Sequence, residues 1–273
     1  MQPYQPLRPM TIGEILDQSF DLYRSHWRSF IKLVLAMIVP VSILQLLVGI
    51  YQYTVYPPTP GVPPTFHFTI LDLLALLILY FVQFVLYLSI IFLAVRYVLN
   101  KPVTGREAIS YVIRRSFPLA ITEILVVLSV LGGFILLIIP GILIGILFSV
   151  VMQVMIVEEY YYGDALRRSW SLVKEQMGKT FVVLLVTNLI VVAIAYGVVF
   201  AFTIPIGIAV SLLNQHFQHI LTVVFSGFMP LIFGIIYPFS IIASTLLYFD
   251  LRIHNEGLDI EMLTQQIAQQ EGA

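Results

Sequence analysis

The chain has 273 residues, of which 59% are hydrophobic and only 11% are charged, and its formal net charge is −1. Soluble proteins have about 45–50% apolar and about 25% charged residues, so this composition excludes an ordinary soluble domain. The net charge gives no indication of nucleic-acid binding. The sequence contains no Cys, which excludes disulfides, thiolate metal ligands and cysteine nucleophiles.

The N-terminal region predicts no cleavable signal peptide, because no basic stretch followed by an apolar core opens the chain. The segment IGEILDQSFDLY, residues 12–23, instead predicts an amphipathic helix. Its predicted apolar face, continued by one turn, consists of Ile12, Leu16, Phe20, Tyr23 and Trp27.

Six apolar runs follow, each of about the length that crosses a membrane as a helix. They lie near residues 31–53, 70–98, 119–139, 141–158, 180–204 and 220–248. Only Pro140 and Gly141 stand between the third run and the fourth. One helix over both runs would be about 60 Å long, about twice the hydrocarbon core of a bilayer. Pro-Gly is also a turn signal, so we predict two spans joined by a tight turn at Pro140 and Gly141.

The basic residues test this number of spans independently. All fourteen Lys and Arg residues fall in four groups. These are Arg8, Arg24, Arg28 and Lys32; Arg96, Lys101, Arg106, Arg114 and Arg115; Arg167, Arg168, Lys174 and Lys179; and Arg252. With six spans every group lies on one side of the membrane, and the positive-inside rule makes that side cytoplasmic. We therefore predict a multi-pass protein of a prokaryotic plasma (inner) membrane, with both termini in the cytoplasm.

Residues 162–173, YGDALRRSWSLV, repeat the pattern of residues 12–23. The matching pairs are Gly13/Gly163, Glu14/Asp164, Leu16/Leu166, Ser19/Ser169, Phe20/Trp170 and Leu22/Leu172. Residues 104–117 match loosely through Gly105 and Glu107. Each segment predicts an amphipathic helix that precedes two spans. These helices either lie among lipid headgroups, with basic residues facing anionic lipid, or pack together as a cap over the spans.

The predicted fold class is therefore an all-α integral membrane protein with six transmembrane helices as three hairpins. A cytoplasmic amphipathic interfacial helix precedes each hairpin. The whole chain, residues 1–273, forms one membrane domain, with repeat units at 1–100, 101–160 and 161–260 and a cytoplasmic tail at 250–273.

Four segments carry a resemblance to a known family. They are PLRPMTIGEILDQSFDLYR (6–24), IPGILIGILF (139–148), VEEYYYGDALRRSWSLVK (157–174) and LYFDLRIHNEGLDIE (247–261). In this order and spacing, the chain resembles the membrane-domain family of glycerophosphoryl diester phosphodiesterases. Some members of that family carry a fused catalytic domain that resembles a TIM barrel, which needs about 250 residues of its own. We expect the membrane domain alone here, and no phosphodiesterase activity.

Candidate contacts with lipid or a partner lie in the polar segments between and after the spans. They are Arg114, Arg115, Arg167, Arg168, Trp170, Asp250 and Arg252. Asp250 and Arg252 either pair with the RRSW segment, residues 167–170, or serve as a stop-transfer anchor. Glu123 is the intramembrane polar candidate, because a carboxylate within a span indicates function by default. The alternative for Glu123 is a pair with Arg114 or Arg115.

The remaining polar residues predict no catalytic site. Glu158 and Glu159 stand beside three tyrosines, which is typical of an interfacial aromatic belt. His216 and His219 share a helical face but match no metal motif, so we expect no catalytic residue, metal or cofactor. We predict a non-enzymatic module: an anchor, scaffold or partner subunit that contacts the lipid bilayer, including anionic phospholipid headgroups, and a protein partner or second copy. The alternative is a transporter or lipid-handling permease, suggested by the repeat and by spans with internal Gly and Pro.

Overall fold

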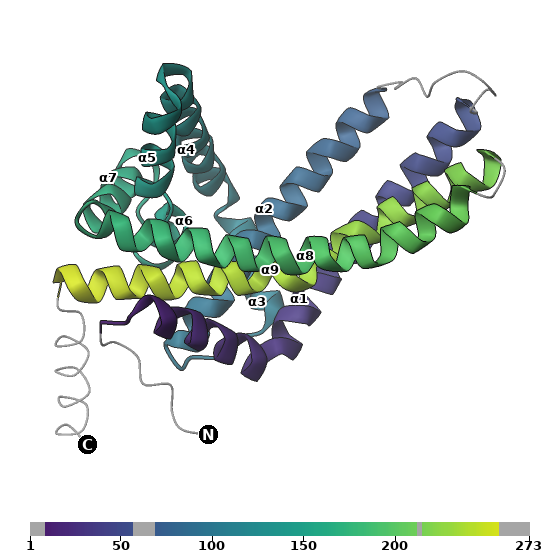
Figure 1. The fold of residues 1–273 in the computed structure, drawn as a ribbon. Coiled ribbons are helices and arrows are strands. Elements are labelled where there is room, and N and C mark those ends of the chain that lie inside the picture. The colour runs from purple at the N-terminus through teal and green to yellow at the C-terminus, as the bar shows by residue number, and fades with distance from the viewer. Residues whose placement is uncertain (1–8, 57–68, 212–214, 257–273) are drawn as a thin grey trace.

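The computed structural model describes residues 9–56, 69–211 and 215–256 (Figure 1). Within these ranges the regular structure is entirely helical, and no strand occurs. Six segments are long and apolar enough to cross a membrane. They are Ile12–Val55, Ile70–Val98, Ser116–Leu136, Ile138–Val157, Tyr162–Ile208 and Pro230–Glu256. The chain is thus a multi-pass membrane protein by length and composition of its helices.

The first helix, α1 (Ile12–Val55), joins two elements that the sequence predicted separately. It begins at a capping box, in which Thr11 and Glu14 bond each other's backbone N–H groups. At His26 the backbone leaves helical geometry, with φ −118° and ψ 18°. This kink turns the N-terminal part away from the long second part (Figure 1). The predicted amphipathic segment and the first span are therefore the two parts of one bent helix.

The next two helices, α2 (Ile70–Val98) and α3 (Gly105–Arg114), also begin at threonine caps. Thr69 accepts a hydrogen bond from the N–H of Asp72, and Thr104 accepts one from the N–H of Glu107. From Phe84 onward α2 is buried at nearly every position, which is the pattern of a helix surrounded by other helices. The second half of α2 therefore forms the centre of the core.

The turn between the third and fourth spans lies earlier than predicted. Helix α4 (Ser116–Leu136) ends at Leu137, which is extended with φ −166° and ψ 158°, and α5 (Ile138–Leu147) follows at once. Pro140 lies in the first turn of α5, where a helix needs no N–H donor. The predicted turn at Pro140 and Gly141 is therefore wrong by about three residues, because Pro140 starts the helix rather than ending one.

Two glycines let α4 and α5 approach closely beside this turn. A Cβ on Gly133 would lie 2.9 Å from the Cα of Gly141, and a Cβ on Gly141 would lie 2.5 Å from the ring of Phe134. Gly145 has no atom within 4 Å of its virtual Cβ. The close packing thus uses Gly133 and Gly141, and not the second glycine of the GxxxG sequence.

The fourth span is broken in its middle. Helix α5 ends at Leu147, and α6 (Val151–Val157) starts after a three-residue interruption. The hydroxyl of Ser169, on α7 (Tyr162–Val173), donates a 2.7 Å hydrogen bond to the freed carbonyl of Leu147. This bond satisfies a helix-end acceptor that would otherwise be buried.

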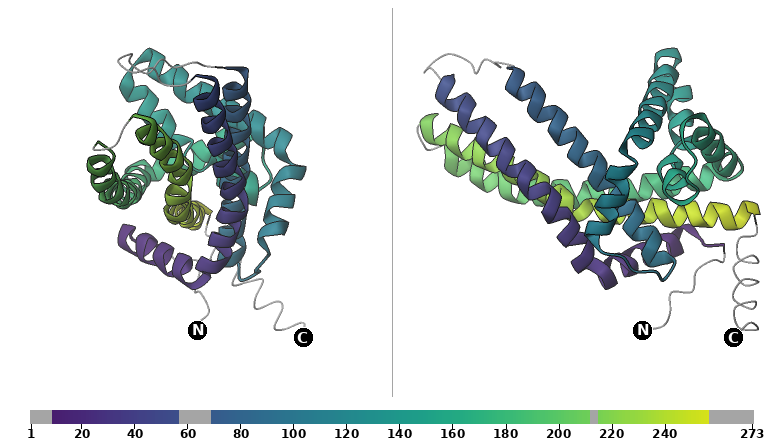
Figure 2. Two further views of the ribbon diagram at one scale, coloured as in Figure 1. Left: turned by 90° about the vertical axis from the view of Figure 1, so that its right-hand side faces the viewer. Right: turned by 180° about the vertical axis from the view of Figure 1, so that it is seen from behind.

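A short 3₁₀ turn (Lys174–Gln176) leads from α7 into α8 (Met177–Ser211), which packs along α9 (Gln215–Glu256). Helix α9 also packs extensively on α1. Figures 1 and 2 show two arms: α4 with α5 forms one, and the outer parts of α1, α2, α8 and α9 form the other. The arms meet where α2, α6 and the last third of α9 form the buried core.

Candidate functional site

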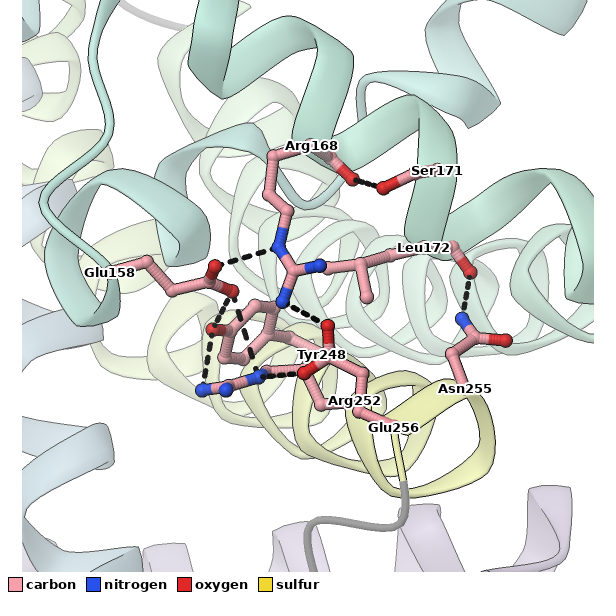
Figure 3. A network of polar contacts seen from close by, with 8 residues as sticks. All are labelled: Glu158, Arg168, Ser171, Leu172, Tyr248, Arg252, Asn255 and Glu256. Atoms are coloured by element: carbon pink, nitrogen blue, oxygen red, sulfur yellow. Dashed lines mark hydrogen bonds and ion pairs between the residues drawn. The ribbon is translucent and has the colours of Figure 1, made fainter.

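A network of charged side chains, here called the clasp, joins the end of α6 to α7 and α9. It consists of Glu158, Arg168, Tyr248, Arg252 and Glu256 (Figure 3). Arg168 Nε donates to Glu158 Oε2 at 2.6 Å, and its Nη2 forms an ion pair with Glu256. Tyr248 donates to Glu158 Oε1 at 2.7 Å, and Arg252 Nε bonds Glu256 Oε2 at 3.1 Å. Each of the two carboxylates therefore contacts both arginines, and Glu158 also accepts from Tyr248.

The clasp is largely shielded from solvent except at Glu256, whose side chain is 28% exposed, and it carries no net charge. The side chains of Glu158, Arg168 and Arg252 are 11%, 22% and 19% exposed. Two arginines balance two glutamates, and their hydrogen-bonding groups are directed at one another (Figure 3). Charged pairs with such partners hold elements in one register, and removing one partner leaves a costly buried charge. The clasp is thus suited to fastening α7 to α9, not to binding an anion.

A second charged cluster fastens the start of the described chain to α8 and α9. Asp250 is fully buried, and its Oδ2 lies 2.5 Å from Lys179 Nζ. Its other oxygen accepts the N–H of Met10 at 2.7 Å, while Lys179 donates to the carbonyl of Met10 at 2.6 Å. Three residues from three distant parts of the sequence thereby satisfy one another's hydrogen-bonding groups.

A third cluster fixes the loop between α6 and α7 to α3. Glu159 has a left-handed φ of 56°, and its carboxylate accepts from Arg115 at 2.9 Å and from the phenol of Tyr111 at 3.2 Å. Burial, opposed by the charge of Arg115, raises the pKa of Tyr111 to about 12. The phenol therefore keeps its proton near neutral pH and remains a donor to Glu159.

The structure separates the seven predicted contact residues into two groups. Arg115, Arg168, Asp250 and Arg252 pair within the protein. Arg114, Arg167 and Trp170 are exposed. Of the two alternatives considered for Asp250, pairing with the RRSW segment does not occur: Asp250 lies two residues from Tyr248 and from Arg252, on the opposite face of α9, and binds Lys179. Arg252 does join that segment, but through the shared carboxylates of Glu158 and Glu256 and not directly.

The two best-matched repeat segments have matching burial. Ser19 and Ser169 are both fully buried, and Leu22 and Leu172 are 5% and 1% exposed. Phe20 and Trp170, their matched aromatic residues, are 56% and 47% exposed. The apolar face predicted for residues 12–27 is therefore partly wrong. Its buried positions are Ile15, Ser19 and Leu22, while Phe20 and Trp27 point away from the core.

Glu123 has neither of the arginine partners considered from the sequence. Arg115 pairs with Glu159, and Arg114 is exposed in the last turn of α3. Oε2 of Glu123 is buried and has no hydrogen-bond partner among the described residues. Among the described residues, Glu123 thus has no cationic partner.

Sequence reasoning missed Glu158, Lys179, Tyr111 and Tyr248 as partners. One signal was available, because Tyr248, Arg252 and Glu256 recur at spacings of four and so share a helical face. The side chains of His216 and His219, together with His67 and residues 257–273, lie outside what the structure describes. Within the described part of the chain, no three His, Asp or Glu residues are grouped as metal ligands.

Comparison with known proteins gives no relative: no family model, curated protein or solved structure matches this chain.

Proposed function

We propose that this chain is a non-enzymatic membrane module whose cytoplasmic face binds anionic phospholipid headgroups and presents a docking surface to a protein partner. Its six spans cross the inner membrane of a prokaryote as three hairpins, with both termini in the cytoplasm. The resemblance to the membrane domain of glycerophosphoryl diester phosphodiesterases agrees with such an anchoring or scaffolding role.

The observation that supports this proposal most directly is the different fate of two neighbouring arginines. The side chain of Arg167 is 88% exposed, whereas that of Arg168 is 22% exposed and held in the clasp. Trp170, one helical turn from Arg167, is 47% exposed. A cation beside an exposed aromatic side chain is the combination that seats a helix among headgroups.

The other two short helical segments present the same combination. On α1, Trp27 is 49% exposed and the guanidinium of Arg28 lies 5.7 Å from its ring centroid. At the end of α3, Arg114 is exposed, and Phe117 on the following helix is 72% exposed. Three segments with cations and exposed aromatic residues favour contact with lipid over packing as a closed cap.

The charged clusters support a structural role for the remaining polar residues. In the clasp and around Asp250, carboxylates are occupied by arginine, lysine, tyrosine or backbone donors. A general acid or base must instead face a substrate with its reactive oxygen. We therefore assign the clusters to holding the helices in place.

A second function, a lipid-handling permease, is favoured by one feature of the spans. The fourth span is interrupted between Leu147 and Val151. Ser149 Oγ within the interruption and Gln153 Oε1 just after it are buried without a partner among the described residues. Broken helices with unsatisfied polar groups occur at transport sites.

The proposal is tested by native mass spectrometry of the purified protein with added phosphatidylglycerol. Changing Arg114→Gln together with Arg167→Gln should weaken binding roughly thirtyfold, because each cation near an anionic surface contributes about 1 kcal/mol. Asp164→Asn, which removes the exposed partner of Arg167, is the control and should not weaken binding. Unchanged binding in the double variant contradicts the proposal. Movement of a fluorescent lipid between leaflets of proteoliposomes would favour the permease instead.

A further inference from the structure

The outer parts of α1 and α2 run alongside each other and leave a cavity of about 360 Å³ between them (Figure 2). The cavity is lined on α1 from Leu44 to Tyr51 and on α2 from Leu71 to Ile78. On each helix the lining residues recur at spacings of three and four, so they form one stripe along the helix. The two stripes line the same space, which is therefore a groove that follows the helices.

The walls of this groove are almost entirely hydrocarbon. Seven of its eight lining residues are Leu, Val, Ala or Ile, and Tyr51 is the eighth. Leu47 and Leu74, in the middle of the two stripes, remain 59% and 50% exposed although each lines the space toward the other helix. Both helices belong to membrane-spanning segments, so this exposed hydrocarbon faces acyl chains and not water.

A polar bridge joins the two helices at the outer end of the groove. Gln52 Nε2 donates to Asp72 Oδ1 at 2.6 Å, and the backbone N–H and hydroxyl of Thr69 donate to Asp72 Oδ2, both at 2.7 Å. All three partners are donors, which suits an ionised carboxylate because it can only accept. Between Lys32 and Arg96 the sequence contains no other Asp, Glu, Lys or Arg. The groove thus ends at one negative charge that no Lys or Arg of these two spans neutralises.

The shape and the charge of the groove together select one class of ligand. A stripe that spans seven residue steps of a helix is about 10 Å long, so the groove suits an extended hydrocarbon chain better than a compact ring. Its volume lies within the range of ligand pockets, about 300–1,000 Å³. At the outer end the phosphate of an anionic lipid would be repelled by the carboxylate of Asp72, whereas a zwitterionic headgroup brings its own ammonium group.

We propose that this groove binds one acyl chain of a zwitterionic phospholipid of the phosphatidylethanolamine type, with the headgroup beside Asp72. The chain lies between the stripes of α1 and α2, and the ammonium group offsets the charge of the carboxylate. With the topology proposed above, this lipid belongs to the external leaflet. The site is separate from the arginine-bearing cytoplasmic face and goes beyond the function proposed for that face.

The test uses photoactivatable phosphatidylethanolamine and phosphatidylglycerol that carry the same diazirine-bearing acyl chain. Each probe is added in trace amount to the protein in bilayers with equal parts of both unlabelled lipids, and mass spectrometry locates the labelled peptides after irradiation. The phosphatidylethanolamine probe should label the groove about fivefold more than the phosphatidylglycerol probe. Ala75→Trp fills the groove and should lower this labelling severalfold. Leu77→Trp is the matched control, because Leu77 is 58% exposed and does not line the groove, and it should change nothing.

Two further variants keep the test valid if Ala75→Trp does not fold. Val48→Phe fills the groove from α1 and should also lower the labelling. Asp72→Asn keeps the size of the side chain but removes its charge, so the two probes should then label the groove to within about twofold of each other. Labelling that is the same in wild type and a folded, filled variant, or a lipid preference that survives Asp72→Asn, overturns the proposal. Loss of phosphatidylglycerol binding in the arginine variants bears only on the function proposed above, so the two failures are distinguishable.

Discussion

The ammonium nitrogen of Lys179 lies 2.5 Å from Oδ2 of Asp250, a residue with no solvent-exposed surface. Changing Asp250→Asn should lower the free energy of unfolding by about 3 kcal/mol, because it leaves the charge of Lys179 without its partner. SDS titration in mixed micelles measures this change. The double variant Lys179→Gln with Asp250→Asn should lose less than the sum of the single variants. Additive losses would show that the two side chains do not act as a pair.

The two adjacent arginines of α7 should respond differently to the same substitution. Arg168→Gln removes a cation that contacts both Glu158 and Glu256, and we expect a loss of about 3 kcal/mol. Arg167→Gln removes an exposed cation 3.9 Å from Asp164, and we expect a change of about 0.5 kcal/mol or less. Unfolding of both variants in the same detergent compares them directly. Equal losses of stability in the two variants would contradict the stabilising role assigned to the clasp.

The two adjacent glycines of α4 provide a similar comparison for packing. Gly133→Ala should destabilise the protein by about 1–3 kcal/mol, because the new Cβ meets the backbone of Gly141, which cannot move aside cheaply. Gly132 has nothing within 4 Å of its virtual Cβ, so Gly132→Ala should stabilise the helix by up to about 1 kcal/mol. The thermal midpoints of the two variants should therefore shift in opposite directions. A downward shift of the same size in both would refute the close approach.

The proposed topology is tested with reporter fusions placed between the spans. Fusions at residues 60, 137 and 213 should report the external side, and fusions at 103, 160 and 265 the cytoplasmic side. The reason is that all the basic residues would then lie in the cytoplasm or beside it. An external signal at residue 103 or 160 would exclude the six-span arrangement.

The sequence by itself determined the class of the protein and the place of its spans. Apolar runs long enough to cross a bilayer must become helices, because the hydrocarbon leaves backbone groups no other partners. The helix starts at Thr69 and Thr104, which we did not predict, are also explained locally, because each threonine side chain caps the backbone that follows it. The match between residues 12–23 and 162–173 also extends to burial at the positions of the shared serines, leucines and aromatic residues.

Where two identical residues are adjacent in the sequence, only the tertiary structure decided the role of each. Arg167 and Arg168, Gly132 and Gly133, and Glu158 and Glu159 look alike in the sequence. Adjacent positions on a helix point about 100° apart, so Arg168 and Gly133 meet other helices while Arg167 and Gly132 do not. Glu158 and Glu159 lie after the end of α6 and meet different partners, Glu158 in the clasp and Glu159 at Tyr111 and Arg115. The partners that make this difference, such as Tyr248 for Glu158, lie up to 90 residues away along the chain. The packing of α9 against α6 and α7 brings the clasp partners together, and the packing of α4 on α5 does the same for Gly133 and Gly141. Periodicity within one segment contains no information about that packing.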